Sequence, residues 1–307
     1  MPKNGSDGLY ASMPNIGVST GGADTLECLL TRIGIDEAEY SGDPNAASAH
    51  VHVFQGSGGN AASGSPSSPA SLWDSKADLE RYDIVMLSCE GSPTTGAISQ
   101  PLADYVSAGG RVFAEHYHYQ FFANQPQFAN TADWSQAGSY AYSGGISAAV
   151  QTTLLNGQPF PEGVALQSWL TNVGALSGGL LSIAQPRSDA VVNAGNVSTR
   201  WLESSGVSPE TTQYFSWDMP FSPPVSDAGV PEYCGRVVFS DLHVSSGGGT
   251  NDYLSSQTVP TGCDSTATLQ ADEDALEFIF FDLSSCVTPI GFPPVPPPPP
   301  PIEAGAQ

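Results

Sequence analysis

The sequence is poor in basic residues: only 8 of its 307 residues are Lys or Arg, against 31 Asp and Glu. Affinity for nucleic acid comes from Lys and Arg that displace counterions from phosphates, so a net charge of −23 argues against a nucleic-acid partner. The same charge disfavours anionic membrane surfaces. No apolar run reaches the ~18 residues of a membrane span, so we expect no span.

Charged residues of either sign are also scarce, at 13% of the chain against about 25% in an average globular protein. Ser, Thr, Asn, Gln and Gly must therefore supply the polar surface, which suits an exported protein. We expect an extracytoplasmic location (periplasmic, cell-surface or secreted), with association with the cell envelope left open. The first residues lack the apolar core of a signal peptide, so such a signal would lie outside this sequence. A cytoplasmic protein of unusual composition is the alternative.

Cys-x-x-Cys spacings are absent, and the five cysteines match no zinc pattern. An expected strand over 235–243 runs away from Cys234 and the expected last helix runs back, so we predict a disulfide between Cys234 and Cys286. Cys28, Cys89 and Cys263 should lie near the opposite edge, where a second bridge could form. In an oxidising compartment each bridge would add about 2–4 kcal/mol of stability.

In the first part of the chain, apolar segments with the pattern of buried strands alternate with segments that have the period of a helix. Strands are expected over 16–19, 51–54, 83–88 and 111–117, and helices over 23–33, 75–81 and 98–110. This alternation predicts a parallel sheet covered by helices. Residues 123–200, rich in Gly, Ser, Ala and Asn, are interpreted as an insertion with a helix within 160–176 and strands near 180–186 and 189–194.

The remaining segments complete the expected domain. Strands over 212–220 and 234–244 and a helix over 266–286 follow the insertion, and consecutive prolines then predict a polyproline II tail. We expect an α/β protein, a flavodoxin-like three-layer sandwich with a mostly parallel central sheet. Its parts would be a disordered segment over 1–14, the domain over 15–287 and a proline-rich tail over 288–307.

Two stretches carry a resemblance to a known superfamily. YDIVMLSCEGS (82–92), a helix, and YVSAGGRVFAEHYHY (105–119) resemble the middle of a class I glutamine-amidotransferase-like domain, whose second strand ends in an elbow bearing a nucleophilic Cys. Here the elbow position falls on His116, which resembles the ThuA-like (trehalose-utilisation) branch. The late strand GRVVFSDLH (235–243) is also similar to that branch, except that His243 follows Leu242 without the usual Gly between them. Residues 15–287 further resemble uncharacterised myxobacterial cell-surface proteins and lipoproteins.

The resemblance implies that the chain is not a glutamine amidotransferase, because no Cys occupies the elbow. Ligands of parallel α/β sheets bind at the carboxyl ends of the strands, so three strand ends should converge on one site. The candidate catalytic residues there are His116, His243, Glu90, Glu115 and Asp241.

Three roles remain open for this set. The two histidines could serve a hydrolase, as an acid–base pair or as metal ligands together with Glu90 or Asp241. They could instead bind a ligand without turnover, or belong to a vestigial site. No cofactor is expected, although a divalent metal is left open. The candidate ligand-contacting residues are Cys89, Gly91, His118 and Trp217.

Two of these candidates have a structural alternative. Cys89 could be a reactive thiol or a structural, disulfide-bonded one, and Trp217 could stack on a sugar or pack in the core. His118 alternates with His116, so at most one of the two faces the site unless an elbow breaks the strand.

The function expected from these observations is binding of a small polar ligand, such as a carbohydrate, at the sheet edge, with hydrolysis open. The alternative is a non-catalytic adhesion or scaffold module that the polyproline segment spaces from the cell envelope.

Overall fold

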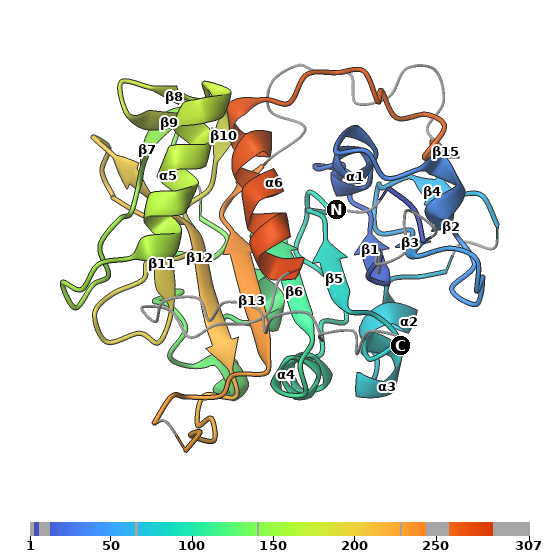
Figure 1. Ribbon diagram of the computed structural model, residues 1–307, viewed down its shortest axis with the longest axis horizontal. Helices are drawn as coiled ribbons and strands as arrows, with labels where there is room; N and C mark the ends of the chain where they lie inside the picture. Colours follow the sequence, from blue (N-terminus) through green and yellow to red (C-terminus); the bar gives the residue numbers. More distant parts are fainter. Residues whose placement is uncertain are drawn as a thin grey trace, which may run out of the picture.

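The computed structural model describes residues 3–5, 13–64, 67–139, 141–227, 229–243 and 258–284. These residues build a mixed α/β protein around one sheet of 11 strands, in the order β2-β3-β1-β5-β6-β13-β12-β11-β7-β9-β8 (Figure 1). Among the described residues, no helix is long and apolar enough to cross a membrane.

The first half of the sheet is parallel from β2 to β13. Its strands are β2 (Tyr40–Ser41), β3 (Val51–Phe54), β1 (Ile16–Ser19), β5 (Ile84–Leu87), β6 (Arg111–Glu115) and β13 (Gly235–Ser240). Beyond β13 each strand runs antiparallel to its neighbour. These strands are β12 (Thr212–Met219), β11 (Thr199–Ser205), β7 (Ile146–Val150), β9 (Leu180–Ile183) and β8 (Leu176–Ser177).

Two short strand pairs lie outside the large sheet. The pairs are β10 (Gln185–Pro186) with β14 (Leu242–His243), and β15 (Thr258–Val259) with β4 (Ala61–Ala62). The β10–β14 pair is antiparallel and brings residues 185–190 over the end of β13.

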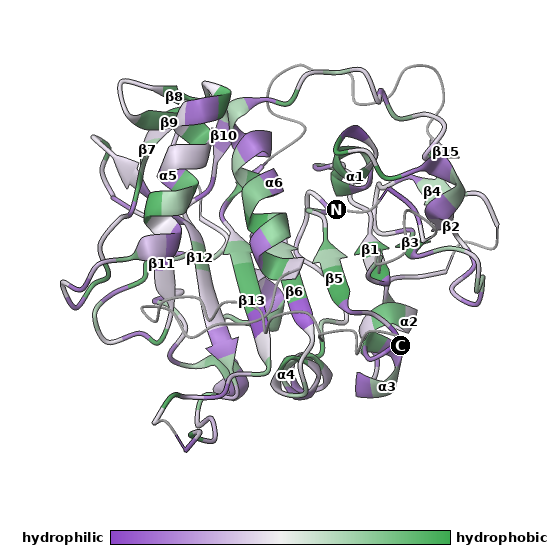
Figure 2. Ribbon diagram, in the orientation of Figure 1, coloured by the Kyte–Doolittle hydropathy of each residue, from purple (hydrophilic) through white to green (hydrophobic). Residues whose placement is uncertain are grey.

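Helices cover both faces of the sheet, because its central strands are apolar on both sides. In β5, Ile84 and Met86 pack on one apolar cluster while Val85 and Leu87 pack on the other, as the two-residue period of a strand requires. Figure 2 shows this hydrophobic character along β5 and β13.

Each apolar cluster has its own set of helices. The first cluster receives α1 (Leu26–Arg32), α5 (Pro161–Val173) and α6 (Ala271–Ser284). The second receives α2 (Ala70–Trp73), α3 (Lys76–Leu79) and α4 (Ser99–Ser107). Three 3₁₀ helices are η1 (Glu37–Glu39), η2 (His116–Phe121) and η3 (Pro126–Phe128).

Three expectations about the fold are corrected. The sheet is parallel only in its first half, because residues 123–200 contribute β7, β8, β9 and part of β11 to its antiparallel half instead of forming an appended insertion. Residues 189–194 form no strand; Val191 makes a single bridge to Asp133. The strand expected over 111–117 ends at Glu115, where η2 begins.

One disulfide joins Cys28, in α1, to Cys263, in the turn after β15. The sequence left a bridge open among Cys28, Cys89 and Cys263, and the structure pairs the first with the third. Cys234 is exposed and unbridged to any other described cysteine. Its predicted partner Cys286 lies outside the described residues, as do the proline-rich tail and most of the N-terminal segment, so that pairing stays a prediction.

Candidate functional site

Three side chains from separate strand ends meet at the carboxyl-end edge of the parallel half-sheet. Cys89 follows β5, His116 follows β6, and His243 ends β14 just after β13. One ligand atom from each lies within 4.8 Å of the others, and all three residues are buried. Cys89 Sγ is 3.4 Å from His116 Nδ1, and the two imidazole centroids are 5.3 Å apart. We call these three residues the Cys-His-His cluster.

The loop after β1 fits closely against this edge. A Cβ atom on Gly21 would lie 2.0 Å from the carbonyl oxygen of Cys89, so only glycine allows this approach. The same loop brings Ala23 and Asp24 beside His243.

His116 occupies a strained elbow. Its φ is +34°, a left-handed conformation that is uncommon for a residue with a bulky side chain. The elbow turns the chain from β6 into η2 and breaks the strand alternation. His118 therefore lies apart from the cluster, with Nδ1 2.8 Å from the hydroxyl of Thr94 and Nε2 2.9 Å from the carbonyl oxygen of Ser88.

The Cys89 thiol is fully buried. The backbone N–H groups of Gly91 and Tyr117 hydrogen-bond to its sulfur, but burial is the larger effect and raises the pKa of the thiol to about 12. A nucleophilic cysteine needs a lowered pKa, so this environment favours a protonated thiol over a reactive thiolate. The backbone N–H of Cys89 donates to Glu115 Oε2 at 3.1 Å.

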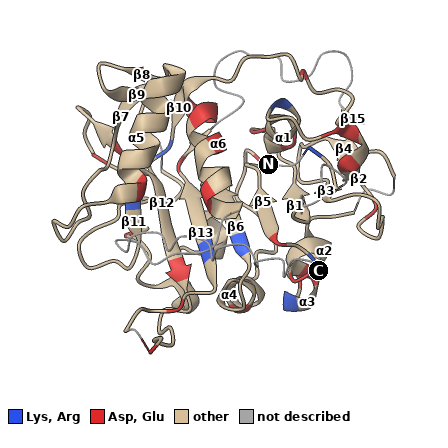
Figure 3. Cartoon of the chain, viewed as in Figure 1, with Lys and Arg blue, Asp and Glu red and all other residues tan. Residues whose placement is uncertain are grey.

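Both histidines of the cluster are held as neutral imidazoles. Burial, followed by His243 and Arg187, lowers the pKa of His116 to about 2. Burial also lowers the pKa of His243, against the opposing charge of Asp24. Arg187 is half-buried and is one of only 8 Lys and Arg residues in the chain. Figure 3 shows how sparse basic residues are among the described residues. A neutral imidazole offers one lone pair to a proton or a metal.

Two pairs of buried carboxyl groups flank the cluster. Glu115 hydrogen-bonds to Asp24, and burial raises the pKa of Glu115 well above its usual range. Asp189 hydrogen-bonds to Asp241, and burial raises the pKa of both, most strongly for Asp241. In each pair the group with the most strongly raised pKa, Glu115 or Asp241, is therefore the protonated carboxyl that donates to its neighbour.

The Asp189–Asp241 pair links the cluster to β10. Asp241 Oδ2 accepts from the backbone N–H of Asp189 at 2.6 Å and of Ala190 at 3.3 Å. Asp189 Oδ2 in turn lies 3.4 Å from His116 Nε2. Asp241 thus reaches His116 through Asp189.

Sequence reasoning missed Asp24, Asp189 and Arg187. Asp24 precedes α1, where an acidic residue suits the helix dipole, so its sequence position alone does not indicate a site. Asp189 and Arg187 lie in the segment whose fold the sequence did not reveal, and no motif surrounds them.

Besides His118, the predicted site residues Glu90 and Trp217 lie away from the cluster. Glu90 is half-buried and accepts from the backbone N–H of Ser57 at 3.0 Å. Trp217 pairs with Val237 in the middle of β13, and the residue is 1% exposed. It packs against Phe122 and Phe128, so the expectation of a ligand-contacting Trp217 is corrected to a core position.

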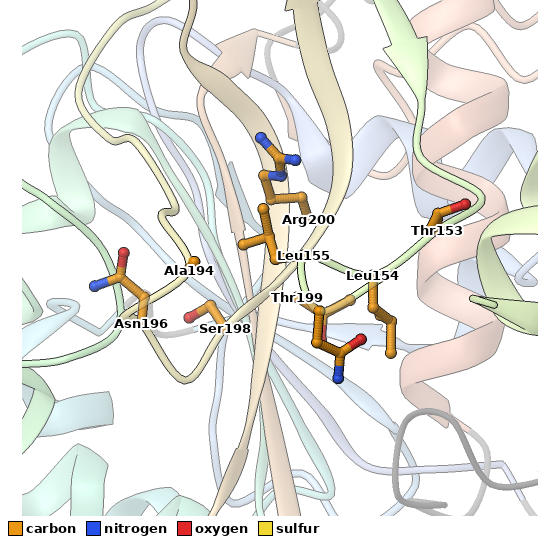
Figure 4. A pocket seen from close by; sticks show the side chains of 9 residues that line it. Thr153, Leu154, Leu155, Ala194, Asn196, Ser198, Thr199 and Arg200 are labelled. Atoms are coloured by element: carbon orange, nitrogen blue, oxygen red, sulfur yellow. The ribbon is translucent and has the colours of Figure 1, made fainter. Parts of the chain in front are cut away.

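A separate pocket of about 190 Å³ lies between the turn after β7 and the start of β11 (Figure 4). Its polar lining includes Asn156, Asn196, Ser198 and Arg200. Because β11 begins where β7 ends, this pocket is at the edge of the sheet opposite the Cys-His-His cluster.

Comparison with known proteins gives no family. No protein-family model matches the chain, and no curated protein matches it. Among solved structures, the exo-β-1,4-mannosidase Op5Man5 from Opitutaceae bacterium strain TAV5 is similar over 76% of this chain and 32% of that one, at 10% identity and a TM-score of 0.28. The chain therefore spans about a third of that structure, and a likeness this weak carries no argument about fold or function.

Proposed function

We propose that this chain is an extracytoplasmic ThuA-like domain, flavodoxin-like in plan, that binds a small polar ligand at the carboxyl-end edge of its parallel half-sheet. The observation that carries the proposal is the meeting of Cys89, His116 and His243, which come from three separate strand ends. Binding at this edge is the general behaviour of parallel α/β sheets.

The backbone at His116 supports the ThuA-like assignment. The elbow of the superfamily is a sharp turn at a strand end, and His116 has that position and a positive φ. Strain of this kind costs about 1–3 kcal/mol and is typical of functional sites.

The Cys28–Cys263 disulfide supports an extracytoplasmic location. Disulfides persist in oxidising compartments and are rare in the cytosol.

The chemistry of the edge favours a neutral, hydroxyl-rich ligand such as a carbohydrate. Neutral imidazoles and protonated carboxyl groups offer both donors and acceptors to hydroxyl groups. Burial lowers the pKa of His116 to about 2, which makes it a weak general base although Asp189 lies beside its Nε2, so the site favours binding over hydrolysis. The thiol of Cys89 has no nucleophilic part in this reaction, because its pKa is raised.

A thermal-shift screen of sugars and other small polar molecules tests the proposal. The informative variant is His116→Asn, because Asn tolerates a positive φ and so removes the imidazole at little backbone cost. The matched control is His50→Gln, since His50 precedes β3 and lies at the opposite edge.

We expect at least one ligand class to raise the melting temperature of the parent and of His50→Gln but not of His116→Asn. If no compound stabilises the parent, the non-catalytic adhesion or scaffold alternative is favoured instead.

A further inference from the structure

We propose that Cys89, His116 and His243 together bind a thiophilic divalent cation of the Zn²⁺ type. The donor set is one sulfur and two imidazole nitrogens, which zinc prefers. The three donor atoms lie within 4.8 Å of one another and are buried. The inference deepens the proposed function and rests on the same edge of the sheet, because the cation would sit where the ligand is expected.

The orientation of His243 is the first argument for a cation. Its Nδ1 is 3.1 Å from the carbonyl oxygen of Ala23, and a carbonyl can only accept, so Nδ1 carries the hydrogen. The other nitrogen, Nε2, then presents a lone pair. This atom is buried and has no hydrogen-bond partner among the described residues, and the residue is only 2% exposed. A buried acceptor without a partner costs free energy that a bound cation would recover.

Each histidine has a carbonyl or carboxylate oxygen beside its second ring nitrogen, as zinc-bound histidines usually have. A metal-bound imidazole typically donates its second N–H to a carbonyl or a carboxylate. His243 donates to Ala23, with Asp24 Oδ2 3.9 Å away. His116 has Asp189 Oδ2 3.4 Å from its Nε2, while its Nδ1 faces Cys89.

The spacing matches tetrahedral coordination after a small movement. Zn–S and Zn–N bonds of about 2.3 and 2.0 Å place sulfur and nitrogen about 3.5 Å apart, and two nitrogens about 3.3 Å apart. The observed distance from Cys89 Sγ to His116 Nδ1 is 3.4 Å. The other separations in the cluster are within 4.8 Å, so the donor atoms must approach one another by up to about 1.5 Å.

Binding exchanges a proton for the cation. The Cys89 thiol releases its proton to solvent, and the thiolate and the two neutral imidazoles then bind Zn²⁺, leaving a net charge of +1. The Glu115–Asp24 and Asp189–Asp241 carboxyl pairs surround this charge. Three protein ligands leave the fourth position open for water or for an oxygen of the ligand, as in catalytic zinc sites.

The test uses the full chain, stripped with a chelator and titrated with Zn²⁺, Co²⁺ or Mg²⁺. We expect one Zn²⁺ per chain, a thiolate-to-cobalt charge-transfer absorption with Co²⁺, and no binding of Mg²⁺, which prefers oxygen ligands. Cys89→Ser should abolish the charge-transfer absorption and weaken Zn²⁺ binding by at least about 100-fold. The matched control Cys234→Ser, at an exposed unbridged cysteine, should change neither.

The inference is overturned if folded Cys89→Ser binds Zn²⁺ as tightly as the parent, or if Co²⁺ gives no charge-transfer absorption in the parent. Circular dichroism establishes that each variant is folded. If Cys89→Ser does not fold, His243→Gln takes its place, because its amide can still donate toward Ala23, and the same loss of Zn²⁺ affinity is expected.

The two proposals fail separately. If Zn²⁺ does not bind but His116→Asn abolishes stabilisation by a small polar ligand, the cation site is wrong and the proposed function stands. If Zn²⁺ binds through Cys89 but no polar ligand stabilises the Zn²⁺-loaded protein, the cation site stands and the proposed function is wrong.

Discussion

Removal of the Cys28–Cys263 disulfide is expected to cost a large part of the stability of the domain. The bond joins residues 235 positions apart, and closing a loop of that length lowers the entropy of the unfolded chain by the equivalent of about 5 kcal/mol. The total stability of a folded domain is about 5–15 kcal/mol. The bond connects α1, near the start of the chain, to the turn after β15, which precedes α6. Its removal therefore separates the first and the last parts of the domain in the unfolded chain.

Urea unfolding of the double variant Cys28→Ala/Cys263→Ala measures this cost. Alanine is the appropriate replacement because both cysteines are buried, 1% and 5% exposed. For an unfolding slope of about 3 kcal/mol per M, the midpoint should fall by about 1.5–2 M urea. Cys234→Ala, at an exposed cysteine, is the control and should leave the midpoint within about 0.2 M.

Two results would refute this reasoning. A midpoint unchanged in the double variant would mean that the unfolded chain gains no freedom from the missing bond. A fall of equal size in Cys234→Ala would mean that the loss comes from removing any cysteine and not from opening this loop.

Three further predictions concern buried ionisable side chains. Burial raises the pKa of Asp272 to about 7, so in the folded protein this carboxyl stays protonated where the unfolded chain ionises; stability should fall by about 4 kcal/mol as the pH rises from about 4 to 7. Melting temperatures across that range should depend less on pH in Asp272→Asn, and an unchanged profile would contradict the assignment. Arg236→Met removes the partner of the buried carboxylate of Asp218 and should cost about 3–5 kcal/mol in urea unfolding, whereas a loss below about 1 kcal/mol would show that the ion pair contributes little. Glu115→Gln should be nearly neutral in the same assay because the glutamate is already protonated, while Glu115→Ala should cost about 1–3 kcal/mol by leaving a buried backbone N–H without its acceptor; equal losses in both would argue against a protonated Glu115.

The parallel half of the sheet could be predicted from sequence because its strands are buried on both faces. Runs such as residues 83–88 are continuously apolar and are separated by helices with their own period, so local pattern and tertiary position agree. The meeting of His116 and His243 followed from this order of strands.

The antiparallel half could not be predicted in the same way. β7 reads ISAAV and β11 reads TRWLESS, in which small and polar residues interrupt the alternation. The strand structure of β7 comes from pairing with β9 and β11, which are distant from it in sequence, and not from local propensity. Asp189 was missed for this reason, since its place beside His116 depends on the β10–β14 pair.

For Trp217 the sequence left two positions open, a sugar-binding surface and the core. The residue alternates with Ser216 and Asp218 along β12 and faces an aromatic cluster, which selects the core. The two-residue period of a strand puts Trp217 on one face of β12 but does not say whether that face is covered. The sheet order and the packing of the second apolar cluster show that it is.

The central claim is that the strand ends at Cys89, His116 and His243 meet at one edge, and the contact between the two imidazoles tests it most directly. Selective labelling of histidine ring protons in a deuterated background allows the nuclear Overhauser effect between them to be measured, with His116→Asn and His243→Gln assigning the signals. At a centroid separation of 5.3 Å, a cross-peak between His116 and His243 is expected in the parent protein. Folded protein in which both signals are assigned and no cross-peak joins them would contradict the account.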